Sequence, residues 1–113
     1  MTIAVRQAGN VTVLDLTGEV DLYHSPTLHG KLAELTTQRQ KQIVLNFEGV
    51  TYIDSSGLAT LIGAFQQLRP HGGTLRLAGV NKNVRSVFTV ARLDKVFAID
   101  ATEADALKAF GID

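Results

Sequence analysis

The most constraining feature of this sequence is a regular alternation between short apolar runs and longer runs with a helical period. The short runs have the length and composition of β-strands: Ile3–Val5, Val11–Leu16, Ile43–Phe47, Thr74–Ala78 and Val96–Ile99. The longer runs repeat apolar residues every three or four positions: Leu28, Leu32 and Leu35; Leu58, Leu61, Ile62, Phe65 and Leu68; Val84, Val87, Phe88 and Ala91; Leu107 and Phe110. The order predicts a single α/β domain over residues 1–113. We expect a mixed, mostly parallel sheet of about five strands, with an N-terminal antiparallel edge and about four helices.

Residues typical of turns and helix caps lie between these runs. The polar stretch Gln7–Asn10 predicts a hairpin between the first two strands, and Thr17–Asp21 predicts a loop. Ser25 followed by Pro26 predicts a helix start, with the serine as N-cap and the proline at the first helical position. The segment Thr102–Asp105 has the form of a capping box that opens the last helix.

One polar turn lies between the most apolar strand and the most strongly periodic helix. Ile43–Phe47 is apolar on both faces, which predicts a central strand covered from both sides. Asp54, Ser55 and Ser56 precede Leu58, and aspartate and serine are preferred residues at a helix N-terminus. Gly57 has no Cβ, so another chain could approach the backbone closely there.

Three loops are predicted at the carboxyl ends of the parallel strands, where open α/β sheets tend to carry their functional residues. They are Gly18–His24, Tyr52–Gly57 and Gly79–Lys82. The turn with the two serines therefore lies on the edge of the sheet where function is expected.

Composition excludes several classes of function. Eleven basic and eleven acidic side chains balance, so there is no electrostatic case for nucleic acid or an anionic membrane. No apolar run reaches the length of a membrane span, and the first residues lack the layout of a signal peptide. The absence of cysteine excludes disulfides and thiolate zinc sites and is compatible with a cytoplasmic protein, which is our expectation.

The motifs of nucleotide, metal and hydrolytic chemistry have little support. There is no phosphate-binding loop, and His24 and His29 fall on different sides of a helix start, so we expect no metal and no cofactor. A hydrolase would need a base beside Ser55 or Ser56, and His24 could approach them, so this alternative stays open. Four carboxylates could form a pair but are better read as solvated or capping groups: Asp15, Glu19, Asp21 and Asp54.

Accepting a phosphoryl group is the one chemistry that needs no catalytic set in this chain. A serine at a helix N-terminus is open to a kinase, and a phosphate there is expected to sit on free N–H groups and the positive end of the helix dipole. It would add about −1.5 to −2 charges. With Asp54 adjacent and Asp21 on the same edge, that charge would repel acidic partners and obstruct a closely packed interface.

Taken together, these segments resemble the STAS domains of bacterial anti-sigma factor antagonists. The resemblance covers nearly the whole chain in the right order, and its most specific part is the Asp-Ser-Ser-Gly-Leu core at 54–58. One departure is Ala59, where many relatives have a second glycine; alanine suits a helix and does not threaten the acceptor. The segments that carry the resemblance are Gly18–Asp21, the helix opened by Ser25, Ile43–Phe47, Tyr52–Leu58, Gly72–Leu75 and Val84–Phe88.

The resemblance implies a mechanism of partner switching. In that family the unphosphorylated domain binds an anti-sigma factor that is also a serine kinase, which releases the sigma factor. The kinase then phosphorylates the serine after the motif aspartate, here Ser55, and a PP2C-type phosphatase reverses the change. By the same resemblance Asp21, Asp54, Ser56 and Gly57 would contact the partner. The alternative is a STAS scaffold or accessory subunit of a stress-signalling or lipid-transport assembly, in which the same surface binds without switching.

Overall fold

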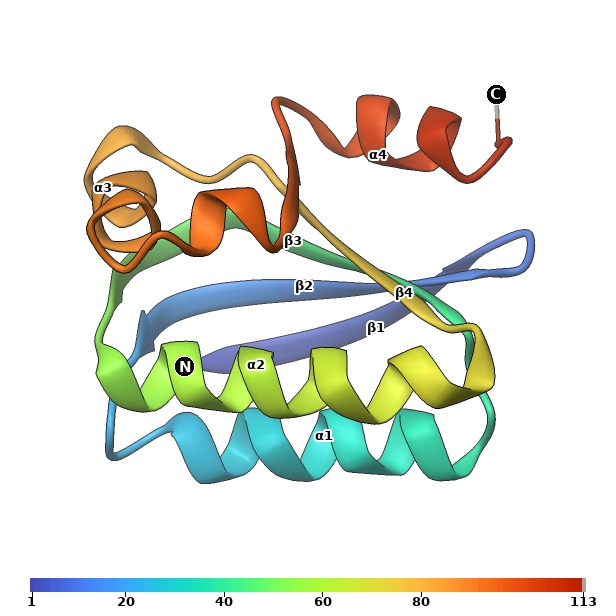
Figure 1. Ribbon diagram of the computed structural model, residues 1–113, viewed down its shortest axis with the longest axis horizontal. Helices are drawn as coiled ribbons and strands as arrows, with labels where there is room; N and C mark the ends of the chain where they lie inside the picture. The colour runs from blue at the N-terminus through green and yellow to red at the C-terminus, as the bar shows by residue number, and fades with distance from the viewer. Residues whose placement is uncertain (113) are drawn as a thin grey trace.

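The computed structural model describes residues 1–112 as one α/β fold with nine main elements (Figure 1). Two single-turn 3₁₀ helices, η1 (Arg69–His71) and η2 (Leu93–Lys95), are also present. The main elements are β1 (Thr2–Ala8), β2 (Val11–Val20), α1 (Ser25–Thr37), β3 (Gln42–Ile53), α2 (Ser55–Leu68), β4 (Thr74–Ala78), α3 (Lys82–Val90), β5 (Ala98–Asp100) and α4 (Glu103–Ala109).

The five strands form one sheet in the order β1-β2-β3-β4-β5. β1 pairs antiparallel with β2, and the three remaining pairs are parallel. α1 and α2 lie side by side along one face of the sheet, and α4 lies on the other (Figure 1). This arrangement confirms the predicted fold class, including the antiparallel edge and the number of helices.

Two apolar clusters hold the layers together, one on each face of the sheet. The larger contains Leu45 and Phe47 of β3, together with the buried leucines of α1 and α2 and the aromatic side chains Phe88 and Phe97. The smaller contains Val44, which points the other way from β3, and is closed by Ala106 of α4. β3 is therefore covered on both faces, as its apolar composition predicts, because successive side chains of a strand point to opposite faces.

The predicted loop at Thr17–Asp21 is wrong over most of its length. β2 continues to Val20 and pairs with a β3 that runs on to Ile53, so the two strands reach the edge of the sheet together. Two register shifts, between Asp15 and Thr17 and between Gly18 and Glu19, make this pairing possible. Gly18 has φ +94°, which a glycine adopts without strain, so the residue that suggested a loop is a kink inside a strand.

Two predicted boundaries also need correction. Ser25 is not the N-cap of α1; His24 is, and the Ser25 hydroxyl instead donates to the Asp21 carbonyl oxygen at 2.6 Å. The last strand comprises Ala98–Asp100 rather than Val96–Ile99, because residues 93–95 form η2 and displace its start. The predicted cap at Thr102 is confirmed, since its hydroxyl accepts from the Asp105 N–H at 3.1 Å.

An ion-pair network joins the edge strand to the last helix. Arg6 Nε donates to Asp15 Oδ2 at 2.6 Å, and the same guanidinium also contacts Glu103. The hydrogen bond from Arg6 lowers the pKa of Asp15 despite its partial burial, and the Asn46 amide, 2.9 Å away, assists. The charged form of Asp15 is therefore favoured in the folded protein.

We expect Asp15→Asn to lower the free energy of unfolding at neutral pH by about 1 kcal/mol, because an exposed network contributes only modestly. The pKa of Asp15 is lower in the folded than in the unfolded state. Its contribution is present above the unfolded pKa of about 3.9 and is lost as the pH falls through the folded pKa. Urea unfolding between neutral and acid pH should show a weaker acid loss for the variant. An equal slope in both proteins would contradict this assignment.

Candidate functional site

The candidate site forms where β2 and β3 end and α2 begins. Val20 and Ile53 are register partners, and the next amide, that of Asp54, donates to the Val20 carbonyl at 3.4 Å. Asn81 brings the third predicted loop to the same edge, because its side chain donates to the Val50 carbonyl at 2.8 Å and accepts from the Val84 N–H at 2.9 Å. The segments after β2, β3 and β4 thus lie at one edge of the sheet, where they were predicted. The predicted loop Tyr52–Gly57 is wrong over most of its length, because β3 runs to Ile53 and α2 begins at Ser55, which leaves only Asp54 between them.

Asp54 connects two of these loops through its carboxylate. Oδ1 accepts from the Ser56 N–H at 2.9 Å and from the Gly57 N–H at 3.2 Å, which makes Asp54 the N-cap of α2. Oδ2 accepts from the Leu22 N–H at 3.1 Å, in the segment between β2 and α1. One side chain therefore fixes both the start of the helix and the neighbouring loop.

The capping role of Asp54 corrects one expectation about a phosphate on Ser55. The amide groups of Ser56 and Gly57 are occupied by the carboxylate, and the Leu58 N–H donates to the Asp54 carbonyl. These first-turn donors are therefore not free to receive a phosphate. A phosphoryl group on Ser55 would add its charge beside an existing carboxylate. Free N–H groups at a helix N-terminus would partly neutralise that charge, but here they are occupied, so the surface becomes more negative than it would with free N–H groups.

The two serines differ in access. Ser55, the first residue of α2, is exposed, whereas Ser56 is partly buried and its carbonyl accepts from the Thr60 hydroxyl at 3.1 Å. An enzyme can reach the Ser55 hydroxyl without opening the helix. Ser55 is therefore the more accessible of the two possible acceptors.

Asp21 and His24 form a local pair beside this turn. His24 Nδ1 lies 2.8 Å from Asp21 Oδ1, and the His24 N–H donates to the same oxygen at 2.9 Å. Partial desolvation raises the pKa of Asp21, but the hydrogen bonds from His24 outweigh it and the pKa lies below its usual range. Nδ1 of His24 is thus paired with Asp21, and within residues 1–112 no hydrogen bond joins His24 to Ser55 or Ser56.

Gly57 lies against the end of β2 inside the domain. A Cβ at this position would lie 2.5 Å from the Val20 carbonyl oxygen and 2.7 Å from Cγ1 of Ile53. The glycine is therefore explained by the close approach of α2 to the sheet. Direct contact between Gly57 and a partner stays a prediction.

Exposed apolar side chains lie on the segments that meet at this turn, and the sequence reasoning missed them. Leu22 and Tyr23 are 73% and 84% exposed in the segment held by Asp54, and Val90 at the end of α3 is 85% exposed. A depression of about 370 Å³ beside Ser55 is lined by Leu58, Val87 and Val90 among others. Two adjacent bulky apolar residues in a predicted loop were the available signal, because such patches mark protein-binding surfaces.

The described residues were also compared with the requirements of a metal site and of a membrane-spanning helix. Within residues 1–112 no group of three or more histidine, aspartate or glutamate side chains is placed to hold a metal ion. None of the helices formed by these residues combines the length and the apolar character needed to cross a bilayer. The arrangement at the α2 N-terminus is an exposed hydroxyl, fixed carboxylates and apolar surface, which together suit docking of another protein.

We expect Asp54→Ala to lower the free energy of unfolding by about 2 kcal/mol, because the variant loses the cap of α2 and the bond to Leu22. Asp54→Asn is the matched control, since its amide oxygen can still cap α2 but its NH₂ group cannot accept from Leu22. It should lose about half as much and raise hydrogen exchange selectively at Leu22. Equal losses in urea unfolding would show that the tie to Leu22 contributes nothing.

Comparison with known proteins identifies the family. A sequence profile of the STAS domain matches residues 2–106, so the chain belongs to the STAS domain family. The anti-sigma-B factor antagonist of Bacillus subtilis (strain 168) is 29% identical over 101 residues, which are 89% of this chain and 92% of that protein.

Two solved structures share the fold described above. An anti-sigma factor antagonist from Mycobacterium paratuberculosis superposes with a TM-score of 0.88 at 25% identity, over 96% of this chain and 92% of that one. The phosphorylated form of the Bacillus cell fate determinant SpoIIAA superposes with a TM-score of 0.76 at 25% identity, over 96% of this chain and 99% of that one.

Proposed function

We propose that this domain is an anti-sigma factor antagonist controlled by phosphorylation of Ser55. In its unphosphorylated form it binds an anti-sigma factor that is also a serine kinase, and this binding releases the sigma factor. Phosphorylation by the bound kinase ends the interaction, and a PP2C-type phosphatase restores the active form. The domain is a regulatory binding module in the cytoplasm and not an enzyme.

The observation that carries this proposal is the setting of the Ser55 hydroxyl. It is exposed at the first residue of α2, next to the fixed carboxylate of Asp54, and it lines a depression together with the exposed side chain of Val90. Exposed Leu22 lies in the segment that Asp54 holds through its N–H. An apolar surface of this kind gains free energy when a partner covers it. A phosphate at its edge would need to be desolvated on binding, which makes the same contact unfavourable.

The relatives support the proposal in two ways. The Bacillus subtilis protein and the mycobacterial structure bear the name of anti-sigma factor antagonists, and the alignment and superposition cover most of each chain. The SpoIIAA structure is of a phosphorylated form, so a domain of this fold can carry a phosphoryl group and keep its architecture. Asp54 and Ser56 flank Ser55, and Asp21 directly precedes Leu22, whose N–H donates to Asp54. We propose that these three residues contact the kinase, with Gly57 beneath them.

The test is intact-mass analysis of the domain after incubation with ATP and a cognate or related anti-sigma kinase, followed by peptide mapping. We expect one added phosphate, located on Ser55, that a PP2C-type phosphatase removes. Ser55→Ala should remain unmodified, and Ser56→Ala, the matched control, should be modified like the natural chain.

Three other results of this phosphorylation test would lead to different conclusions. Continued labelling of Ser55→Ala at Ser56 would mean that the acceptor is the neighbouring hydroxyl. Binding to the kinase without any phosphate would favour the scaffold alternative, in which the surface binds without switching. If several kinases neither bound nor labelled the domain, the proposal would be overturned.

A further inference from the structure

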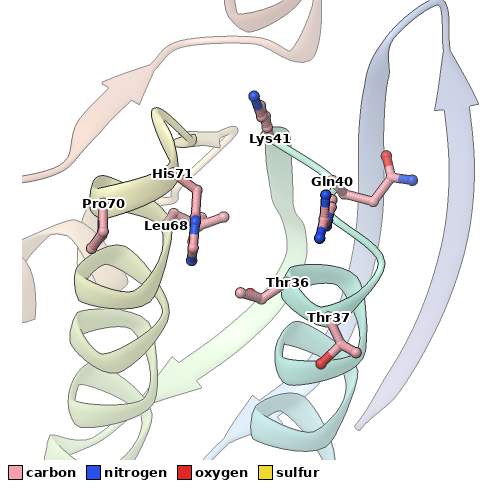
Figure 2. A pocket seen from close by; sticks show the side chains of 8 residues that line it. Thr36, Thr37, Gln40, Lys41, Leu68, Pro70 and His71 are labelled. Atoms are coloured by element: carbon pink, nitrogen blue, oxygen red, sulfur yellow. The ribbon is translucent and has the colours of Figure 1, made fainter.

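A second pocket lies at the end of the molecule opposite Ser55. Residues at and just after the C-terminal ends of α1 and α2, most of them exposed, line an open depression of about 530 Å³ (Figure 2). The 14 residues of α2 separate it from Ser55 by about 20 Å, because an α-helix rises about 1.5 Å per residue. It is therefore independent of the candidate site and of the function proposed for it.

Basic and apolar side chains characterise this pocket. Arg39, Lys41 and His71 line it, and none of its eight described lining residues is acidic. Neither Arg39 nor Lys41 has an ion-pair partner within residues 1–112. Figure 2 shows Leu68 and His71 pointing from one helix toward the space between the helices, with Thr36 facing them from the other.

The backbone of Arg39 is fixed by the end of α1. α1 ends in a Schellman motif, in which the Arg39 N–H donates to the Thr36 carbonyl and the Gln40 N–H to the Leu35 carbonyl, both at 3.0 Å. Arg39 has φ +61°, a left-handed conformation that usually falls to glycine. At the corresponding position after α2 the chain does use glycine, Gly72, with φ +71°. Arginine holds this conformation at a greater backbone cost than glycine, and it does so again at Arg92 (φ +61°) after α3, so the conformation belongs to the helix end and does not by itself mark a binding site.

Helix dipoles do not account for the charge at this pocket. Each helix C-terminus contributes about half a negative charge, so two termini contribute about one. Arg39 and Lys41 together carry two fixed positive charges, and the Schellman hydrogen bonds have already satisfied the Leu35 and Thr36 carbonyls. A net positive charge remains beside apolar side chains.

We propose that this pocket binds a small organic phosphate. A phosphate monoester with about two negative charges matches the two fixed cations, and the fork of donors on arginine fits two phosphate oxygens at once. Pro70 provides an exposed apolar side chain for the organic part, and only the edge of the buried Leu68 reaches the pocket. The volume lies in the range of small-molecule sites.

The test is an NMR titration of the ¹⁵N-labelled domain with phenyl phosphate, inorganic phosphate and benzoate. We expect saturable shifts with phenyl phosphate at residues 36–41 and 68–73, weaker binding of inorganic phosphate, and weaker binding of benzoate. Arg39→Gly should reduce the affinity for phenyl phosphate by about tenfold or more. The variant should fold, because glycine adopts the same backbone conformation without strain.

Arg92→Gly is the matched control. Arg92 also has φ +61°, at the end of α3, and does not line the pocket, so its replacement should change the affinity by less than about twofold. Equal losses in the two variants, or no saturable binding of phenyl phosphate, would overturn the proposal and leave the cations as partners of the helix C-termini. Equal affinity for inorganic phosphate or for benzoate would overturn the assignment to an organic phosphate.

Discussion

Ser55→Asp is expected to weaken binding to an anti-sigma kinase by at least about tenfold, which corresponds to about 1.4 kcal/mol. The new carboxylate would lie beside Asp54, whose oxygens are already fixed by three backbone amides and cannot turn to avoid it. Like charges placed at an interface, and a charge that must be desolvated against apolar surface, both oppose binding. A phosphate on Ser55 carries more charge and should weaken binding further.

Charge and bulk can be separated at this position. Ser55→Asn introduces nearly the same shape as aspartate without its charge, and Ser55→Ala removes the hydroxyl alone. Calorimetric titration of the kinase should give nearly natural affinity for Ser55→Ala and an intermediate value for Ser55→Asn, while circular dichroism shows all three folded. The same affinity for Ser55→Asp and Ser55→Asn would contradict the argument from charge.

Gly57→Ala should destabilise the domain by about 1–3 kcal/mol, as overpacking of a tight site does. The added methyl group would lie 2.5 Å from the Val20 carbonyl oxygen and 2.9 Å from Cγ1 of the same valine. The first of these atoms belongs to the backbone of β2, so the clash is relieved only if α2 moves away from the sheet. Urea unfolding monitored by circular dichroism measures the loss.

A second glycine on the same helix is the control for this substitution. A Cβ at Gly63 would have no other atom within 4 Å apart from the helix itself and its chain neighbours. Gly63→Ala should therefore stabilise the domain by about 0.5–1 kcal/mol, since alanine has the higher helix propensity. If both substitutions acted in the same direction, helix propensity and not packing against Val20 would govern Gly57.

The fold was largely predictable because most of its helices and strands have a clear local spacing of apolar residues. Leu28, Leu32 and Leu35 repeat with the helical period and are buried together, and the apolar run at 43–47 is the centre of the sheet. The predictions failed where pairing overrides local composition. Gly18 and its polar neighbours read as a loop, but two register shifts let β2 follow β3 to the edge of the sheet.

The candidate site was predictable in its centre and not in its surroundings. A helix start within Asp54–Ser56 follows from residue preference, although that preference does not choose between the aspartate and the two serines as N-cap; the exposure of Ser55 follows from its place on the first turn. That Asp54 also holds the Leu22 amide depends on a contact between residues 32 positions apart, which no periodicity encodes. The position of Val90 beside Ser55 depends on how α3 packs, and is equally invisible in the sequence.

The order of the strands affects how the chain can fold during synthesis. Each strand of the sheet pairs with the one made just before it, so the sheet can grow by one strand at a time without waiting for a distant partner. The face that bears Val11, Val13 and Val44 is the exception, because the side chains that close it come from residues 106–112, apart from Ala8 and Ala78. In a nascent chain these valines therefore stay exposed until the last helix is complete. A chain that ended before Ala106 would keep this apolar face of the sheet exposed and would be prone to aggregate with other chains.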